Sequence, residues 1–144
     1  MEMKIDSYIK EQFQIKEVDV KTYSPLALAY IGDGIFDLVI RTLVVGKGNT
    51  RASQLHYQTS HIVKAQSQAK MIEALEEHLT EEEADVYRRG RNAKSNTAAK
   101  NASIVDYRKA TGFEALMGYL YLTDRFERML ELTKMGLELT DTPI

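Results

Sequence analysis

The chain has 144 residues, of which 44% are hydrophobic and 28% charged, so it is long and apolar enough for one domain with a buried core. The absence of Cys excludes a disulfide scaffold, a Cys-ligated zinc site and a thiol nucleophile. No apolar run reaches the ~18–20 residues of a membrane span, and the amino end is too charged for a secretory signal. We therefore expect a soluble cytoplasmic protein without a membrane partner. The net charge of −2 does not by itself indicate a nucleic-acid ligand.

Apolar residues recur at helical spacing through the first part of the chain, and they predict a short helix near residues 4–14. Ser24 followed by Pro25 is typical of a helix start, because a capping Ser precedes a Pro in the first turn. This second helix should run to about Val45 and stop at the glycines that follow. It is apolar nearly all round, which predicts a central position.

Residues 51–77 predict either one long helix or two shorter ones. Thr80 followed by three Glu residues is a capping box, and the helix that it starts should end near Gly90. Residues 91–103 show no apolar period and are rich in Asn, Ser, Thr and Ala. We interpret them as a loop, and a loop of this length in a compact domain is usually functional or disordered.

The helical pattern resumes near Val105 and continues to Leu122. Thr123 and Asp124 then predict the cap of a last helix. Two Pro and eight Gly leave few points at which helices would break, and we find no convincing strand, repeat or second domain. The sequence thus predicts a single all-α domain over residues 1–144.

Charge is segregated along the chain. Residues 73–85 hold seven acids and no Lys or Arg, whereas residues 86–109 hold seven Lys or Arg residues against the single acid Asp106, a local charge of +6. Bases neutralise phosphates, and Asn side chains donate hydrogen bonds to phosphate or 2′-hydroxyl oxygens. The candidate RNA contacts are Arg88, Arg89, Arg91, Asn92, Lys94, Lys100 and Asn101. Gly90 would let the backbone approach closely. The alternative is a solvated loop that pairs with the acidic run.

Two carboxylates, Asp33 and Glu114, lie in windows that otherwise have the pattern of buried helix. A buried carboxylate is unfavourable unless it is paired, hydrogen-bonded or bound to a cation. Both windows contain glycines, which favour a close approach of the two helices: Gly32, Gly34, Gly112 and Gly118. If the helices cross there, the two acids meet and repel each other unless a proton or a divalent cation lies between them.

Oxygen ligands alone suit Mg²⁺ or Mn²⁺, which usually keep several waters. Asp37, one turn after Asp33, would add an oxygen through water. The alternative is an ordinary buried salt bridge, with three candidate basic partners: Arg41, Lys64 and Arg108. The three His residues have no metal-like spacing.

Four segments carry a recognisable pattern: Leu28–Phe36 (LAYIGDGIF), Lys64–Lys70 (KAQSQAK), Arg88–Lys94 (RRGRNAK) and Phe113–Leu122 (FEALMGYLYL). Together they resemble the ribonuclease III endonuclease domain, and specifically the short Mini-ribonuclease III family. Their order and spacing agree with the family over about residues 24–139. The resemblance implies an all-helical domain that forms a homodimer and cleaves double-stranded RNA with Mg²⁺. It also implies precursor 23S ribosomal RNA as the substrate, and it identifies Asp33 and Glu114 as catalytic, metal-binding residues.

The chain departs from longer ribonucleases III at positions where they carry further acids, which here are Ala29, Leu26 and Thr111. The Mini branch shares these replacements. The longer enzymes also append a double-stranded-RNA-binding domain, so we expect RNA binding here to come from the catalytic domain, with the +6 segment as the substitute. The rival interpretation is a non-catalytic helical RNA-binding or adaptor protein that keeps the fold without the chemistry.

Overall fold

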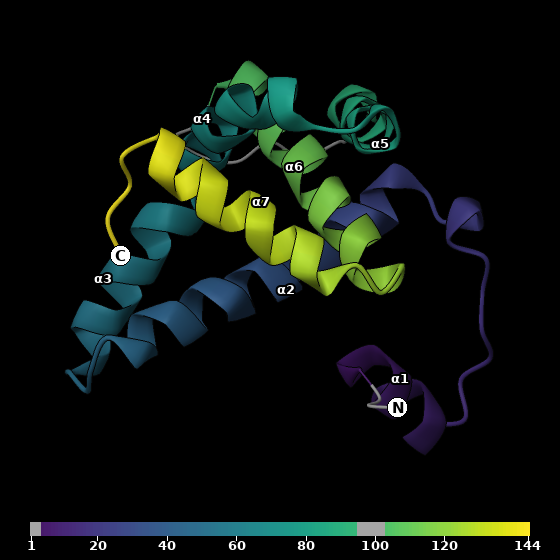
Figure 1. Ribbon diagram of the computed structural model, residues 1–144, viewed down its shortest axis with the longest axis horizontal. Helices are drawn as coiled ribbons and strands as arrows, with labels where there is room; N and C mark the ends of the chain where they lie inside the picture. The colour runs from purple at the N-terminus through teal and green to yellow at the C-terminus, as the bar shows by residue number, and fades with distance from the viewer. Residues whose placement is uncertain (1–3, 95–102) are drawn as a thin grey trace.

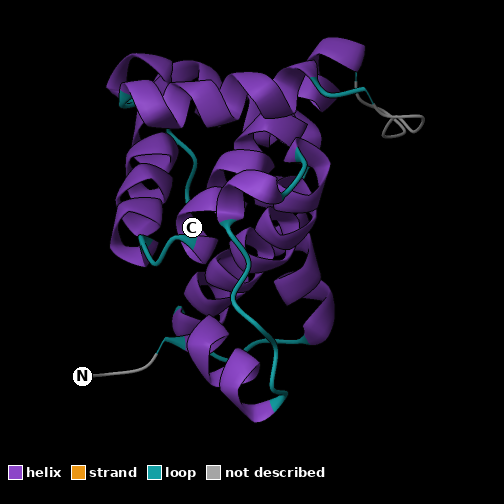
Figure 2. Cartoon of the chain, turned by 90° about the vertical axis from the view of Figure 1, so that its right-hand side faces the viewer, coloured by secondary structure: helices purple, strands orange, loops and turns teal. Residues whose placement is uncertain are grey.

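The computed structural model describes residues 4–94 and 103–144, and within these ranges all regular structure is helical (Figure 2). The helices are α1 (Ile5–Gln12), α2 (Pro25–Gly46), α3 (Ala52–Val63), α4 (Ala65–Leu75), α5 (Glu81–Asn92), α6 (Ile104–Leu122) and α7 (Phe126–Leu139), with short 3₁₀ turns at Val20–Thr22 and Glu76–His78. The predicted all-α class is confirmed.

Helices α2 and α6 cross at the centre of the molecule, and α7 runs across the front of the view in Figure 1. The crossing is close because a glycine of each helix faces the backbone of the other helix. A Cβ at Gly32 would overlap the Glu114 carbonyl oxygen, and a Cβ at Gly118 would overlap the Leu28 carbonyl oxygen. Gly34 has open space around it, so the expectation that it contributes to the close approach was wrong.

The core extends from this crossing toward α4 and α7. Phe36 of α2 and Phe113 of α6 meet edge to face, with ring centroids 5.0 Å apart. Buried Ile72, Leu116 and Leu132 belong to the same cluster, so helices α2, α4, α6 and α7 all contribute to it. Burial of this apolar surface, rather than helix propensity alone, holds the helices in place.

Two of the predicted helix starts are present as expected. The Ser24 hydroxyl accepts a hydrogen bond from the Ala27 amide, at 3.1 Å, ahead of Pro25. Thr80 and Glu83 form the full capping box, in which each side chain accepts from the other residue's backbone amide. The 51–77 segment is two helices, because Lys64 between them has extended backbone with ψ 155°.

The predicted cap of the last helix was wrong. Thr123 ends α6 instead, since its hydroxyl donates to the Tyr119 carbonyl oxygen at 2.7 Å. Asp124 then adopts a left-handed conformation with φ 63°, and α7 begins after Arg125 without a side-chain cap. The Thr hydroxyl was already used by the helix that precedes it, which the sequence did not reveal.

Helix α5 ends at Asn92, two residues past Gly90, which agrees with the expected end near Gly90. Gly90 is buried and faces α6, where a Cβ would come within 2.7 Å of the Ala115 Cβ and 2.9 Å of the Gly112 Cα. Its small size therefore serves helix packing rather than an approach to a ligand. As a consequence, Arg88, Arg89, Arg91 and Asn92 lie on a helix and not in a loop.

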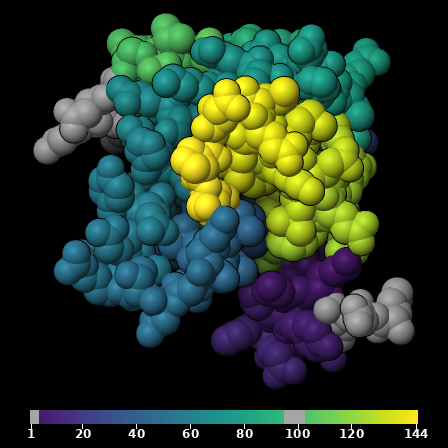
Figure 3. Space-filling model, turned by 60° about the vertical axis from the view of Figure 1, so that its left-hand side comes forward, coloured from purple at the N-terminus to yellow at the C-terminus, as the bar shows by residue number. Residues whose placement is uncertain are grey.

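Helix α1 lies at the edge of the molecule (Figures 1 and 3) and has no buried residue. Its apolar side chains are exposed, Ile5 by 57% and Tyr8 by 52%, and so is Phe13 just after it, by 76%. Among the described residues, no helix is long and apolar enough to cross a membrane.

Candidate active site

The α2–α6 crossing brings Asp33 and Glu114 together. Gly32 seats its backbone directly against the carbonyl of Glu114, and the next residue along α2 is Asp33. The two side chains lie within interaction distance of each other, Asp33 toward the exposed surface and Glu114 half-buried behind it. The meeting of the two acids that the glycine pattern predicted is present.

The surroundings of Glu114 disfavour its charge. Burial is the largest cause and the neighbouring Asp33 carboxyl group is the next, and together they raise the pKa of Glu114 from an ordinary value of 4.5 to about 9. The amide of Gln68 acts in the opposite direction and favours the ionised form. Without a cation, Glu114 therefore holds a proton at neutral pH and shares the site with a carboxylate.

Among the described residues, no basic side chain pairs with either acid. Arg41, one expected salt-bridge partner, pairs with Asp37 instead, with Nε 2.6 Å from Oδ2. Within residues 4–94 and 103–144, neither Asp33 nor Glu114 has an ion pair with any Lys, Arg or His. The ordinary salt-bridge interpretation of the two acids was therefore wrong for the described residues. Two neighbouring carboxylates without a countercharge are the donor set that a hard divalent cation fits.

The protein supplies few oxygens to such an ion. In the described part of the chain, no group of three or more His, Asp or Glu side chains is placed to hold a metal. Asp37 is engaged with Arg41, so its expected role through a bridging water stays a prediction. A cation at Asp33 and Glu114 would complete its shell with water and substrate oxygens, as Mg²⁺ commonly does.

Gln68 is the site residue that sequence reasoning missed. It lies on α4, is only 1% exposed, and faces Glu114 across the α4–α6 contact. The segment that contains it, Lys64–Lys70, was noted for its resemblance, but its many polar residues are typical of a helix surface. Only the packing of α4 on α6 reveals that one of its glutamines points inward.

The bases that precede the undescribed segment project from the end of α5. Arg88, Arg89 and Asn92 are exposed, and Arg91 lies over the Tyr87 ring with its guanidinium carbon 5.5 Å from the centroid. Positive charge at the carboxyl end of a helix is favourable, because it complements the helix dipole. Lys94 is exposed just beyond the helix. The other two predicted contacts, Lys100 and Asn101, lie outside the described residues.

The acidic run pairs mostly with other helices and not with these bases. Its three strongest ion pairs are Glu73 with Lys109 at 2.7 Å, Glu82 with Arg125 at 2.7 Å and Glu83 with Arg128 at 2.8 Å. Arg88 pairs with Asp85 at 3.3 Å, and both side chains are exposed, so this contact is weak. Among the described residues, three of the seven acids pair with other helices and only Asp85 pairs with a base at the end of α5, which leaves that end as a basic surface.

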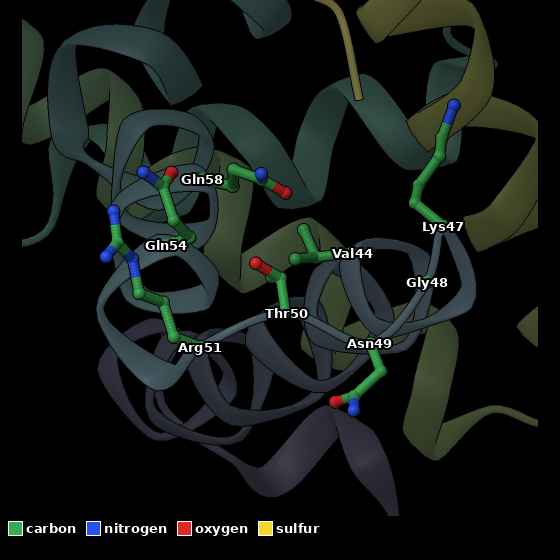
Figure 4. A pocket seen from close by; sticks show the side chains of 8 residues that line it. All are labelled: Val44, Lys47, Gly48, Asn49, Thr50, Arg51, Gln54 and Gln58. Atoms are coloured by element: carbon green, nitrogen blue, oxygen red, sulfur yellow. The ribbon is translucent and has the colours of Figure 1, made fainter.

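A hollow away from the acid pair lies at the corner between α2 and α3 and has a volume of about 650 Å³ (Figure 4). It is lined by Val44, Lys47, Gly48, Asn49, Thr50, Arg51, Gln54 and Gln58. All of these residues except Val44 are exposed, so their polar groups are open to solvent. The hollow contains neither acid of the pair, and its chemistry does not demand a ligand.

Comparison with known proteins identifies the domain family of this chain. Residues 26–125 match the Ribonuclease III domain, a range that includes Asp33, Glu114 and the basic end of α5. The chain belongs to the ribonuclease III family. It is therefore an endoribonuclease, and the family implies double-stranded RNA as its substrate class. The rival interpretation of a non-catalytic adaptor is not supported.

Curated relatives place the chain in the short branch of the ribonuclease III family. It is 47% identical to the Mini-ribonuclease 3 of Clostridium tetani, over 92% of this chain and 87% of the relative. It is 52% identical to that of Enterococcus faecalis over 79% and 88%, and 40% identical to that of a Thermoanaerobacter species over 98% and 99%. A crystal structure of a Fusobacterium nucleatum protein has a similar fold, with a TM-score of 0.78 and 26% identity over 85% of this chain and 99% of that one.

Proposed function

We propose that this ribonuclease III family member cleaves double-stranded RNA with Mg²⁺, or Mn²⁺ in its place, held by Asp33 and Glu114. The observation that supports the proposal is the pair of neighbouring carboxylates without a basic partner among the described residues. Asp33 and Glu114 would hold the cation, which would supply a polarised phosphoryl oxygen and a water of lowered pKa for in-line attack on the phosphodiester.

The two acids have different tasks in this proposal. Asp33 is exposed and offers its carboxylate toward the substrate side of α2. Glu114 is held behind Asp33 by the α2–α6 crossing. Its pKa of about 9 would fall beside a bound cation, because a positive charge stabilises the ionised carboxylate. The glycine contacts fix the two backbones, so the separation of the carboxyl groups is set by the fold.

RNA binding is assigned to the basic end of α5 and the segment after it. Double-stranded RNA is recognised mostly by shape, through phosphate and 2′-hydroxyl contacts. The exposed Arg88, Arg89 and Lys94 suit phosphates, and Asn92 suits a phosphate or sugar oxygen. Arg91, which lies over the Tyr87 ring, adds positive charge from a more fixed position.

The finer parts of the proposal follow from the resemblance to Mini-ribonuclease III. We propose precursor 23S ribosomal RNA as the substrate, a homodimer as the active form and the cytoplasm as its location. A dimer would present one acid pair to each strand of a duplex. An exposed apolar stripe on α2, on which Tyr30 is 84% and Leu38 49% exposed, supports the assembly.

The test is to incubate the protein with duplex RNA that contains the paired ends of precursor 23S RNA, with Mg²⁺ or with EDTA. Cleavage on both strands only with Mg²⁺ is the expected result, with ends mapped inside the paired stem. Metal-independent cleavage would contradict the metal assignment. A duplex that is bound but left intact in Mg²⁺ would contradict the catalytic assignment.

A further inference from the structure

Gln68 carries a buried amide that its immediate surroundings do not satisfy. It is 1% exposed, and among the described residues its Nε2 has no partner within hydrogen-bonding geometry. Leaving a buried donor unpaired is unfavourable, and such groups are rare in native proteins. A functional role for this amide would explain why it is buried here.

The position of Gln68 identifies that partner. Its neighbours on the inner face of α4 are apolar and buried, including Met71, Ile72 and Leu75. The polar group that its amide faces is the carboxyl of Glu114 on α6, where it favours the ionised form. The Gln68 amide is therefore close enough to act on the Glu114 carboxyl, but its Nε2 does not meet the distance and angle of a formed hydrogen bond.

We infer that Gln68 is a positioning residue, which donates a hydrogen bond from Nε2 to the Glu114 carboxylate and so orients it toward the divalent cation. The inference rests on the proposed function, because it needs a cation at Asp33 and Glu114. A carboxylate that binds a metal with one oxygen leaves lone pairs free, and a buried donor behind it fixes its orientation. Gln68 does not touch the reacting atoms in this assignment.

The inference predicts an effect on cation affinity rather than on folding. Loss of an outer hydrogen-bond partner typically weakens metal binding by about 10–100-fold. Gln68→Met keeps the approximate length of the side chain and removes the unpaired amide, so stability in EDTA should stay level or rise. Cleavage should then require a higher Mg²⁺ concentration and recover when Mg²⁺ is saturating.

The experiment measures Mn²⁺ binding to the metal-free full-length protein by calorimetry, together with its melting temperature in EDTA and cleavage against Mg²⁺ concentration. Thr59→Val is the control, since Thr59 is a buried polar residue of α3 outside the acid pair, at 5% exposure. We expect Gln68→Met to bind Mn²⁺ about 10–100-fold more weakly than the wild type and the control.

The outcomes separate this inference from the proposed function. Equal Mn²⁺ affinity in Gln68→Met and the wild type overturns the positioning role and leaves the metal site intact. A wild-type protein that binds no Mn²⁺ overturns the metal site itself, and the inference with it. If Gln68→Met does not fold, Gln68→Leu tests the same loss of the amide with another apolar side chain.

Discussion

The buried position of Glu114 beside the Asp33 carboxylate makes the stability of the protein depend on pH. In the metal-free protein its pKa is about 9, whereas in the unfolded chain it returns to about 4.5. Between these values the unfolded state has lost the proton that the folded state keeps. The free energy of unfolding therefore falls as pH rises through this window, and the contribution is fully present only below about pH 4.5.

We predict that melting temperature in EDTA decreases between about pH 5 and about pH 9, and that Glu114→Gln makes this decrease smaller. Glutamine keeps the shape of the side chain but cannot lose a proton, so it avoids burying a charge. Thermal unfolding of both proteins across this pH range is the measurement. The prediction fails if the two proteins lose stability in parallel.

The sequence revealed one part of this site and concealed another. Asp33 and Glu114 were predictable, because each is a lone acid in an apolar, glycine-containing window. Gln68 was not predictable, because Lys64–Lys70 contains polar residues on every side and its burial depends on how α4 lies against α6. A polar residue buried by tertiary packing leaves no local pattern.

At the scale of elements, the site depends on how closely α2 and α6 approach. We predict that Gly32→Ala destabilises the protein by at least about 1–3 kcal/mol, because the added Cβ overlaps the Glu114 carbonyl and must push the helices apart. Gly46→Ala is the matched control on the same helix, since nothing lies within 4 Å of its Cβ. Its effect should stay within about 0.5 kcal/mol.

Denaturant unfolding of the two glycine variants provides the measurement. If Gly32→Ala is as stable as Gly46→Ala, the helices are not in the contact described. The pattern of glycines predicted the crossing but not its details, since Gly34 takes no part and Gly90 turned out to serve the α5–α6 contact. Small residues within helices were thus a useful guide to helix packing.

The basic end of α5 yields a prediction about substrate affinity. Alanine at Arg88, Arg89, Arg91 and Lys94 should weaken duplex RNA binding. It should also reduce the salt dependence of log K by roughly one unit or less for each lost phosphate contact. Affinity is measured at several salt concentrations in Ca²⁺, to permit binding while slowing cleavage.

A double variant, Lys47→Ala with Arg51→Ala, removes two exposed bases at the α2–α3 hollow and is the control. Its salt dependence should change less than that of the four-residue variant. An unchanged slope in the four-residue variant would mean that the RNA binds to another surface, and that the end of α5 is only solvated.

At the scale of the whole molecule, α2 is both the central helix and a source of exposed apolar surface. Tyr30 and Leu38 are largely exposed two turns apart, on either side of Asp33 along the helix. An apolar stripe beside the acid pair is the kind of surface that a second copy covers. We predict a sedimenting species of twice 16.4 kDa at micromolar concentration.

Glutamate at both Tyr30 and Leu38 should shift this species to the monomer. Tyr57→Glu is the control, because Tyr57 is 67% exposed on α3 and outside the stripe. A wild-type protein that sediments as a monomer would reject the dimer, and dissociation by the control alone would place the interface elsewhere.

The central claim is that Asp33 and Glu114 together hold the cation that drives cleavage. Its most direct test is the cleavage rate of duplex RNA at saturating Mg²⁺ for Asp33→Asn and Glu114→Gln, with Glu138→Gln of the exposed α7 surface as the control. We predict that each site variant remains folded and loses at least about a hundredfold in rate. This is because metal-ion catalysis contributes several kcal/mol and each ~1.4 kcal/mol is a factor of ten. The control should cleave like the wild type, and wild-type rates in either site variant would contradict the assignment.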